Sequence, residues 1–335
     1  MGGDQVTARI DSDLIPLLSR RNDRLLTVAL IGYAVLVVAI MFDRGIALTP
    51  DVLAVAFGLS AVLLGRGRLF LRDWIPFIAL LLAYELMRGI ADDTGLTVHV
   101  EDLVLADRII SFGAIPTQVL QEALRPDTGT DPFAILATVV YMLHFALPFV
   151  TGYVLWVWRR PQFYDFVAGL IVLSLAGFVT YLLIPAAPPW YAADAGALAG
   201  PDGAPVIEYL KPAAFEELAK ALGFDGRYLY SLAWSASPNL VAAFPSLHVA
   251  YPFLAFLALR RAFGRVGWLA FGYTVLVSFS VLYTGDHWLI DVVAGIAYAY
   301  VAFYLIVDSP AWLRVRTDRL WSAVTARLPR PGGSG

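Results

Sequence analysis

Residues 132–156 read PFAILATVVYMLHFALPFVTGYVLW and contain no Asp, Glu, Lys or Arg. A helix that crosses the hydrocarbon core of a bilayer needs about 20 apolar residues, so this run is long enough to span one.

The whole chain has the same apolar composition, because 59% of its 335 residues are hydrophobic and only 15% are charged. Soluble domains carry about 25% charged residues. This composition excludes a disordered chain, and the net charge of −3 excludes nucleic-acid binding through bulk positive charge. The absence of cysteine excludes disulfides, zinc–thiolate sites and thiol catalysis.

Apolar runs of this kind recur along the chain and predict an all-α, polytopic membrane protein with about eight transmembrane helices. The runs are residues 25–42, 52–64, 74–87, 132–156, 166–184, 247–259, 266–283 and 289–307. Cytoplasmic loops retain Lys and Arg, and most of the 24 basic residues fall in the two terminal segments and in alternate loops. This pattern predicts that both termini lie in the cytoplasm.

The positions of the apolar runs and of the loops between them divide the chain into three predicted parts. Residues 1–73 form an N-terminal cytoplasmic segment with two additional transmembrane helices, residues 74–307 form a core of six helices, and residues 308–335 form a basic cytoplasmic tail. The core has two long outer loops, residues 91–131 and 185–245, both rich in acidic residues that we expect to face water.

The outer loops contain short helical patterns. Residues 100–124 are amphipathic, and Pro116 predicts two short helices rather than one. A further helix is expected at residues 213–222. The apolar residues of the first stretch are expected to lie on the membrane surface, and these are Leu103, Val104, Ile109, Ile110, Val119 and Leu120.

Two of the four histidines lie at the predicted outer ends of transmembrane helices. His248 ends the stretch AFPSLH at residues 243–248, and His287 lies in YTGDHWLID at residues 283–291. His287 and Asp291 are four residues apart, so they share one face of a helix. The carboxylate can accept the imidazole N–H, fix the tautomer and make the other ring nitrogen more nucleophilic. His144 and His99 are expected to be a hydrogen-bonded residue within the membrane and a surface-loop residue, although a role for His144 in the site stays open.

The two histidine motifs resemble the second and third signatures of the type 2 phosphatidic acid phosphatase (PAP2) superfamily. Together with PAAPPWY at residues 185–191, they are most similar to the inositol phosphorylceramide synthase branch, the inositolphosphotransferases. The resemblance covers the six-helix core. It implies a membrane enzyme that works without metal or cofactor, in which His287 attacks phosphorus and forms a phosphohistidine. It also implies that Asp291 orients His287, that His248 serves as acid and then base, and that Ser246 hydrogen-bonds a phosphoryl oxygen.

The chain departs from the superfamily where phosphate-binding cations are expected. The first signature, a Lys, six intervening residues and then Arg-Pro, is absent, and Val281 replaces the Arg of the third signature. Because a transferring phosphoryl group needs positive charge around its oxygens, another cation is needed. The first candidate is Arg88, beside Tyr84 at the outer end of the third run, and the weaker candidates are Lys211 and Arg227. Arg88 could instead extend to the lipid headgroups or pair with Glu85.

The sequence also suggests places for four further residues. Pro189 and Trp190 are candidates for shaping a headgroup pocket. Trp190 and Trp288 could instead belong to the aromatic belt of the membrane interface. Asp286 is expected to face water.

The sequence therefore predicts a lipid phosphotransferase in the cell membrane, with its active site at the outer leaflet. Its substrates are a phospholipid donor of a phosphoinositol-like headgroup and a lipid or glycan hydroxyl acceptor. One alternative is a lipid phosphatase that hydrolyses phosphatidic acid or a polyprenyl (di)phosphate with the same residues. Another is a transporter that uses the histidines as a proton relay. The excess of Arg over Lys is typical of a GC-rich bacterial genome and suggests a bacterial plasma membrane.

Overall fold

The computed structural model describes residues 50–88, 95–222 and 240–308, so the predicted run at residues 25–42 and both terminal segments lie outside it. The chain divides into two compact units, Met1–Leu71 and Arg72–Gly335. In the first unit, α3 (Pro50–Leu63) is followed by a turn at Gly65, whose φ of 70° is readily adopted by glycine. The first residues of α4 (Gly67–Arg88) follow this turn.

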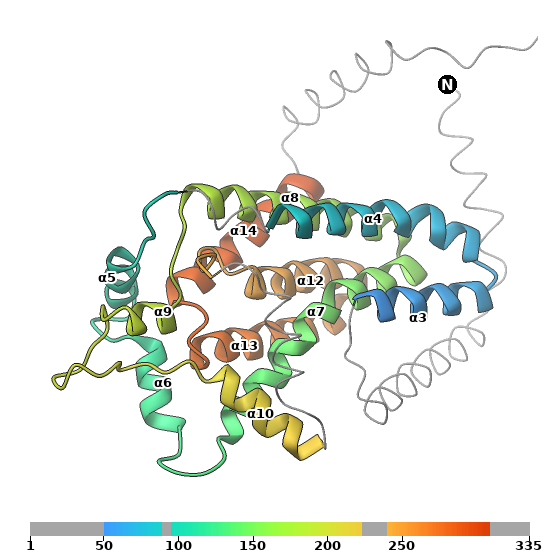
Figure 1. The fold of residues 1–335 in the computed structure, drawn as a ribbon. Helices are drawn as coiled ribbons and strands as arrows, with labels where there is room; N and C mark the ends of the chain where they lie inside the picture. The colour runs from blue at the N-terminus through green and yellow to red at the C-terminus, as the bar shows by residue number, and fades with distance from the viewer. Residues whose placement is uncertain (1–49, 89–94, 223–239, 309–335) are drawn as a thin grey trace, which may run out of the picture. The chain divides into compact units, whose positions relative to one another are not determined.

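The second unit is a helical bundle built around α12 (Leu247–Phe263), and no strand occurs in its described residues. α12 packs against α7 (Pro132–Trp158), α8 (Arg160–Leu183), α13 (Trp268–Tyr283) and α14 (Leu289–Val307). Figure 1 shows α12 in the middle of this bundle. Every predicted run within the described residues overlaps one of the helices α3, α4, α7, α8, α12, α13 and α14.

Four segments of the described chain are long and apolar enough to cross a membrane. They are Pro132–Trp158, Arg160–Leu183, Leu247–Tyr283 and Leu289–Val307, and the third contains α12 and α13 joined by the 3₁₀ turn Gly264–Gly267. The total of eight spans and the cytoplasmic position of the termini remain predictions.

A polar cluster and an aromatic cluster hold α4 against α7 and α8. The buried Asp73 carboxylate accepts hydrogen bonds from Arg160 Nε at 2.7 Å and from Trp156 Nε1 at 3.0 Å. Trp74 lies next to Asp73, and its ring centroid is 5.5 Å from that of Phe163 on α8. Because the Asp73 carboxylate has both a cationic and a neutral donor, its buried charge is compensated.

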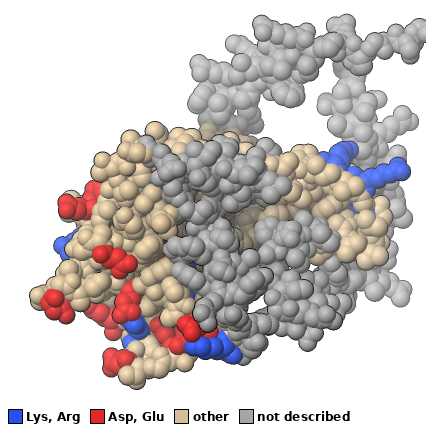
Figure 2. Space-filling view, in the orientation of Figure 1, with Lys and Arg blue, Asp and Glu red and all other residues tan. Residues whose placement is uncertain are grey.

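Four short helices gather at the opposite end of the bundle and form what we call the helical cap (Figure 1). They are α5 (Glu101–Ile110), α6 (Pro116–Leu124), α9 (Pro189–Asp194) and α10 (Lys211–Leu222). Pro116 is the first residue of α6, so the predicted break into two helices is observed. Figure 2 shows acidic side chains over this end of the molecule.

The inner face of the cap packs on protein, which corrects part of the expectation for residues 100–124. Leu103 and Val104 are buried in a core cluster with Trp288, so they do not lie on a membrane surface. Ile109 and Val119 remain exposed. Trp288 is fully buried, and its indole N–H donates to the Ala187 carbonyl at 2.7 Å. It therefore belongs to the protein core and not to an interfacial aromatic belt.

Candidate active site

The site is built on His287, which lies in the turn between α13 and α14. His287 is 3% exposed, and its Nδ1 lies 2.8 Å from the Ala243 carbonyl oxygen. A carbonyl can only accept a hydrogen bond, so Nδ1 must carry the proton. In the neutral imidazole, Nε2 then has the free lone pair that a nucleophile needs.

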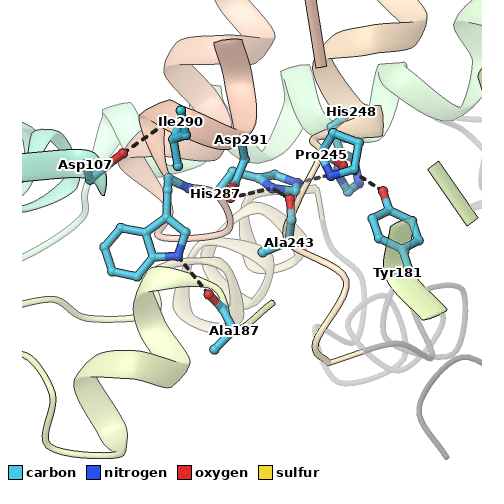
Figure 3. Close-up of polar contacts among 10 residues, drawn as sticks. Asp107, Tyr181, Ala187, Ala243, Pro245, His248, His287, Ile290 and Asp291 are labelled. Carbon is cyan, nitrogen blue, oxygen red and sulfur yellow. Dashed lines mark hydrogen bonds and ion pairs between the residues drawn. The ribbon is translucent and has the colours of Figure 1, made fainter. Parts of the chain in front are cut away.

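The second histidine of the site, His248, contacts Nε2 of His287. His248 is the second residue of α12, and its Nδ1 lies 2.9 Å from Nε2 of His287. Because Nε2 of His287 acts as the acceptor, Nδ1 of His248 is the donor. The two histidines are separated by 39 residues in the chain, and Figure 3 shows them side by side. The juxtaposition that the two motifs predict is therefore present.

Asp291 lies on the same side of His287, but at a longer distance than the Ala243 carbonyl. Its Oδ2 is 3.4 Å from Nδ1 of His287 and accepts the backbone N–H of Trp288 at 2.8 Å. The carboxylate is completely buried, and its Oδ1 has no hydrogen-bond partner among the described residues. Asp291, the third residue of α14, thus caps the start of this helix and adds negative charge beside His287, while the Ala243 carbonyl provides the shorter hydrogen bond.

Ser246 is held in place by α14. Its backbone N–H donates to the carbonyl oxygen of Asp291 at 3.0 Å. A Cβ added at Gly295 would lie 2.3 Å from the carbonyl oxygen of Ser246, so only glycine permits this close approach. The Ser246 side chain is fully buried, and its Oγ has no hydrogen-bond partner among the described residues.

Lys211 is buried beside the histidines, and this corrects the expectation for Asp286. Lys211 Nζ lies 2.7 Å from Asp286 Oδ1, and the Asp286 side chain is 11% exposed, so Asp286 does not face open water. Burial alone lowers the pKa of the Lys211 ammonium, but the negative charge of Asp286 more than compensates and raises that pKa above its ordinary value. The ion pair with Asp286 therefore favours the charged form of Lys211.

Lys211 also reaches the histidine pair through an aromatic ring. Its Nζ lies 3.3 Å from the ring centroid of Tyr141, whose hydroxyl oxygen is 3.2 Å from Nε2 of His248. Of the cations that the sequence suggested, Lys211 is the one that the structure brings to this place. Tyr84 and Arg88 belong to α4, but their side chains lie outside the described residues, and so does Arg227.

Pro189 and Trp190 begin α9, which lies against the turn that carries His287. The backbone N–H of Trp190 donates to the Gly285 carbonyl at 3.2 Å, and its ring stacks on Tyr209 with centroids 4.9 Å apart. Gly285 has φ +83°, and a Cβ there would lie 3.4 Å from the Glu208 carbonyl oxygen. The Pro-Pro-Trp segment is therefore adjacent to the site.

Two residues near the site, Tyr141 and Asp107, gave no recognisable signal in the sequence. Tyr141 lies within an ordinary apolar helix. His144, whose role in the site the sequence left open, lies on the same helix, and its ring centroid is 4.9 Å from that of His248. Asp107 reads as one acidic loop residue among many, yet it is fully buried and accepts the backbone N–H of Ile290 at 3.0 Å. Burial raises the pKa of this carboxyl.

Comparison with known proteins agrees with this geometry. Residues 112–305 match the family model of the PAP2 superfamily, a range that contains both histidines and Asp291. The chain belongs to the PAP2 superfamily.

The chain is similar to several known proteins over about half its length. It is 28% identical over 177 residues to the inositol phosphorylceramide synthase catalytic subunit of Schizosaccharomyces pombe, which covers 50% of this chain and 39% of the relative. It is 30% identical over 179 residues to the corresponding subunit of Saccharomyces cerevisiae, covering 52% of this chain and 43% of that protein.

A bacterial protein shows a similar likeness. The phosphoinositol dihydroceramide synthase of Bacteroides thetaiotaomicron is 27% identical over 179 residues, covering 50% of this chain and 54% of its own length. The chain thus spans about half the length of the curated relatives it matches. No solved structure matches the chain.

Proposed function

We propose that this protein is a membrane phosphotransferase that moves a phosphoinositol-like headgroup from a phospholipid to the hydroxyl of a lipid or glycan. The observation that carries the proposal is the 2.9 Å contact between Nδ1 of His248 and Nε2 of His287, with Nδ1 of His287 anchored on a carbonyl. This arrangement supplies a nucleophilic lone pair and a proton donor at one point. The printed names of the fungal and bacterial relatives support the choice of headgroup.

In the first half-reaction, Nε2 of His287 attacks the phosphorus of the donor lipid. The bond from phosphorus to the diacylglycerol oxygen breaks, and that oxygen takes the electron pair together with a proton from Nδ1 of His248. The headgroup phosphate is then held on His287 as a phosphohistidine. The partner groups on Nδ1 of His287, Ala243 and Asp291, stabilise the positive charge that develops on this ring.

In the second half-reaction, an acceptor hydroxyl gives its proton to His248 and attacks the phosphohistidine. A covalent intermediate lets diacylglycerol leave and the acceptor enter at the same place. Lys211 and Ser246 are the described groups that we assign to the phosphoryl oxygens, with Arg88 and Tyr84 as further candidates. Trp190 and Pro189 are proposed to border the headgroup. We place the site at the outer leaflet of a bacterial plasma membrane, because the basic loops lie at the other end of the helices.

The test uses the purified protein in detergent, where no gradient can drive transport. Phosphatidylinositol with a radiolabelled phosphate should label the wild-type protein through a bond that acid breaks and alkali does not. His287→Ala should abolish both labelling and headgroup transfer to added diacylglycerol. His99→Ala is the matched control, since His99 lies in an exposed loop beside Asp102 and should leave both unchanged.

Hydrolysis is the second candidate, because water could replace the acceptor alcohol at the same residues. Rapid release of inorganic phosphate from phosphatidic acid without any alcohol would show a phosphatase instead. Retained transfer in His287→Ala would refute the catalytic assignment itself.

A further inference from the structure

Tyr141 connects the buried cation to the histidine pair. It lies on α7 and is 3% exposed. Its hydroxyl oxygen is 3.2 Å from Nε2 of His248, and the two ring centroids are 4.9 Å apart. The ammonium of Lys211 lies over the Tyr141 ring, 3.3 Å from its centroid.

We propose that Tyr141 is a positioning residue that holds the imidazole of His248 with Nδ1 toward the reacting phosphorus, in a form that can both give and take a proton. The proposal rests on the proposed function and adds to it a residue that lies outside both histidine motifs. Tyr141 acts through His248 and does not itself contact the phosphoryl group.

The hydrogen-bond directions give the reason. Nδ1 of His287 donates to the Ala243 carbonyl, so Nδ1 of His248 must donate to Nε2 of His287. A neutral His248 then needs a donor at its Nε2, whereas a protonated His248 needs an acceptor there. A tyrosine hydroxyl can do either. Tyr141 therefore satisfies Nε2 in both protonation states without any change in the ring orientation.

The Tyr141 hydroxyl can remain hydrogen-bonded to Nε2 of His248 while His248 gives a proton in the first half-reaction and takes one in the second. When protonated His248 passes its Nδ1 proton to the diacylglycerol oxygen, Nε2 keeps its proton and donates it to the Tyr141 oxygen. Nδ1 is left with a lone pair that faces the reaction centre, ready to take the proton of the acceptor hydroxyl. Removal of the hydroxyl takes away a group that favours the tautomer with the proton on Nε2, and this is the tautomer that leaves Nδ1 able to act as the base.

The surroundings hold Tyr141 in this position. Its ring packs edge-on against Phe145 with centroids 5.6 Å apart, and Lys211 is itself fixed by Asp286. His287 from the α13–α14 turn and His144 from α7 also lie beside His248, and the ring of His144 stacks on Tyr251 of α12. The Tyr141 hydroxyl contacts His248 at Nε2, the nitrogen opposite the one that faces His287.

The test is Tyr141→Phe, which removes the hydroxyl and keeps the ring that carries Lys211. With phosphatidylinositol as donor and diacylglycerol as acceptor in detergent micelles, we expect kcat to fall about 10- to 100-fold with little change in KM. A nitrophenyl ester of phosphoinositol should restore most of the first half-reaction, because nitrophenolate leaves without needing a proton. A merely structural residue would not show this dependence on the leaving group.

Tyr273→Phe is the matched control. The Tyr273 hydroxyl donates to the carbonyl of Val140 at 2.7 Å, so this variant loses a hydrogen bond to the same helix without touching His248, and its kcat should stay near that of the wild type. Wild-type kcat in Tyr141→Phe, or an equal loss with both donors, would overturn the proposal. An inactive wild type, or an active His287→Ala, would instead count against the proposed function.

Discussion

At the scale of single residues, the clearest result concerns what anchors His287. The spacing of His287 and Asp291 suggests that the carboxylate fixes the imidazole, but the Ala243 carbonyl is closer to Nδ1, at 2.8 Å against 3.4 Å. A neutral carbonyl can fix the tautomer as well as a carboxylate can. The shorter hydrogen bond of Asp291, 2.8 Å, is accepted from the backbone N–H of Trp288 at the start of α14. Asp291 therefore contacts both the start of this helix and the imidazole of His287.

Lys211 is the residue whose role a double substitution can decide. Lys211→Met alone leaves Asp286 buried without its partner, and we expect a destabilisation of about 3–5 kcal/mol. Lys211→Met combined with Asp286→Asn removes both charges, so most of the stability should return, measured as Tm in detergent. Transfer should stay reduced by about 100-fold or more, because the phosphoryl oxygens still lack the cation.

The same pair of variants separates catalysis from structure. Recovery of both Tm and transfer in the double variant would show that the Lys211–Asp286 pair only supports the fold. Lys220→Met provides the control, since Lys220 lies on the same helix in an exposed pair with Glu216 and is worth little to stability.

At the scale of elements, the site depends on how closely α14 approaches the segment before α12. Gly295 faces the Ser246 carbonyl, and a Cβ there would lie 2.3 Å from that oxygen. Gly295→Ala should therefore push Ser246 and the start of α12 away, costing about 1–3 kcal/mol and most of the transfer activity. The measurements are Tm and headgroup transfer in detergent.

Gly272→Ala is the matched control on α13, because a Cβ at Gly272 meets nothing within 4 Å. Its Tm should be unchanged or slightly higher, since alanine favours the helix over glycine. An equal effect of the two substitutions would contradict the close approach of α14 to Ser246.

At the scale of the whole molecule, the distribution of basic loops predicts which face of the membrane carries the site. The chain has no cysteine, so single cysteines can be introduced without background. In intact cells, we expect Glu122→Cys on the helical cap to react with a membrane-impermeant maleimide. Arg265→Cys, in the turn between α12 and α13, should react only after permeabilisation, because basic loops stay in the cytoplasm. The reverse pattern would place the site on the cytoplasmic side.

The sequence by itself determined what depends on local composition and spacing. Apolar runs of bilayer length mark helices wherever they occur, and the Pro-Ser-Leu-His and His-x-x-x-Asp motifs name His248, His287 and Asp291. Only the tertiary structure decided which distant groups meet them: the Ala243 carbonyl, the Tyr141 hydroxyl, the Lys211–Asp286 pair and the buried Asp107. The reason is physical. Every residue has a backbone carbonyl, so the sequence does not indicate which carbonyl meets a histidine. The letter for a tyrosine or an aspartate is the same whether solvent or the protein interior surrounds the side chain, so the role of such a residue becomes known only from its burial and its contacts.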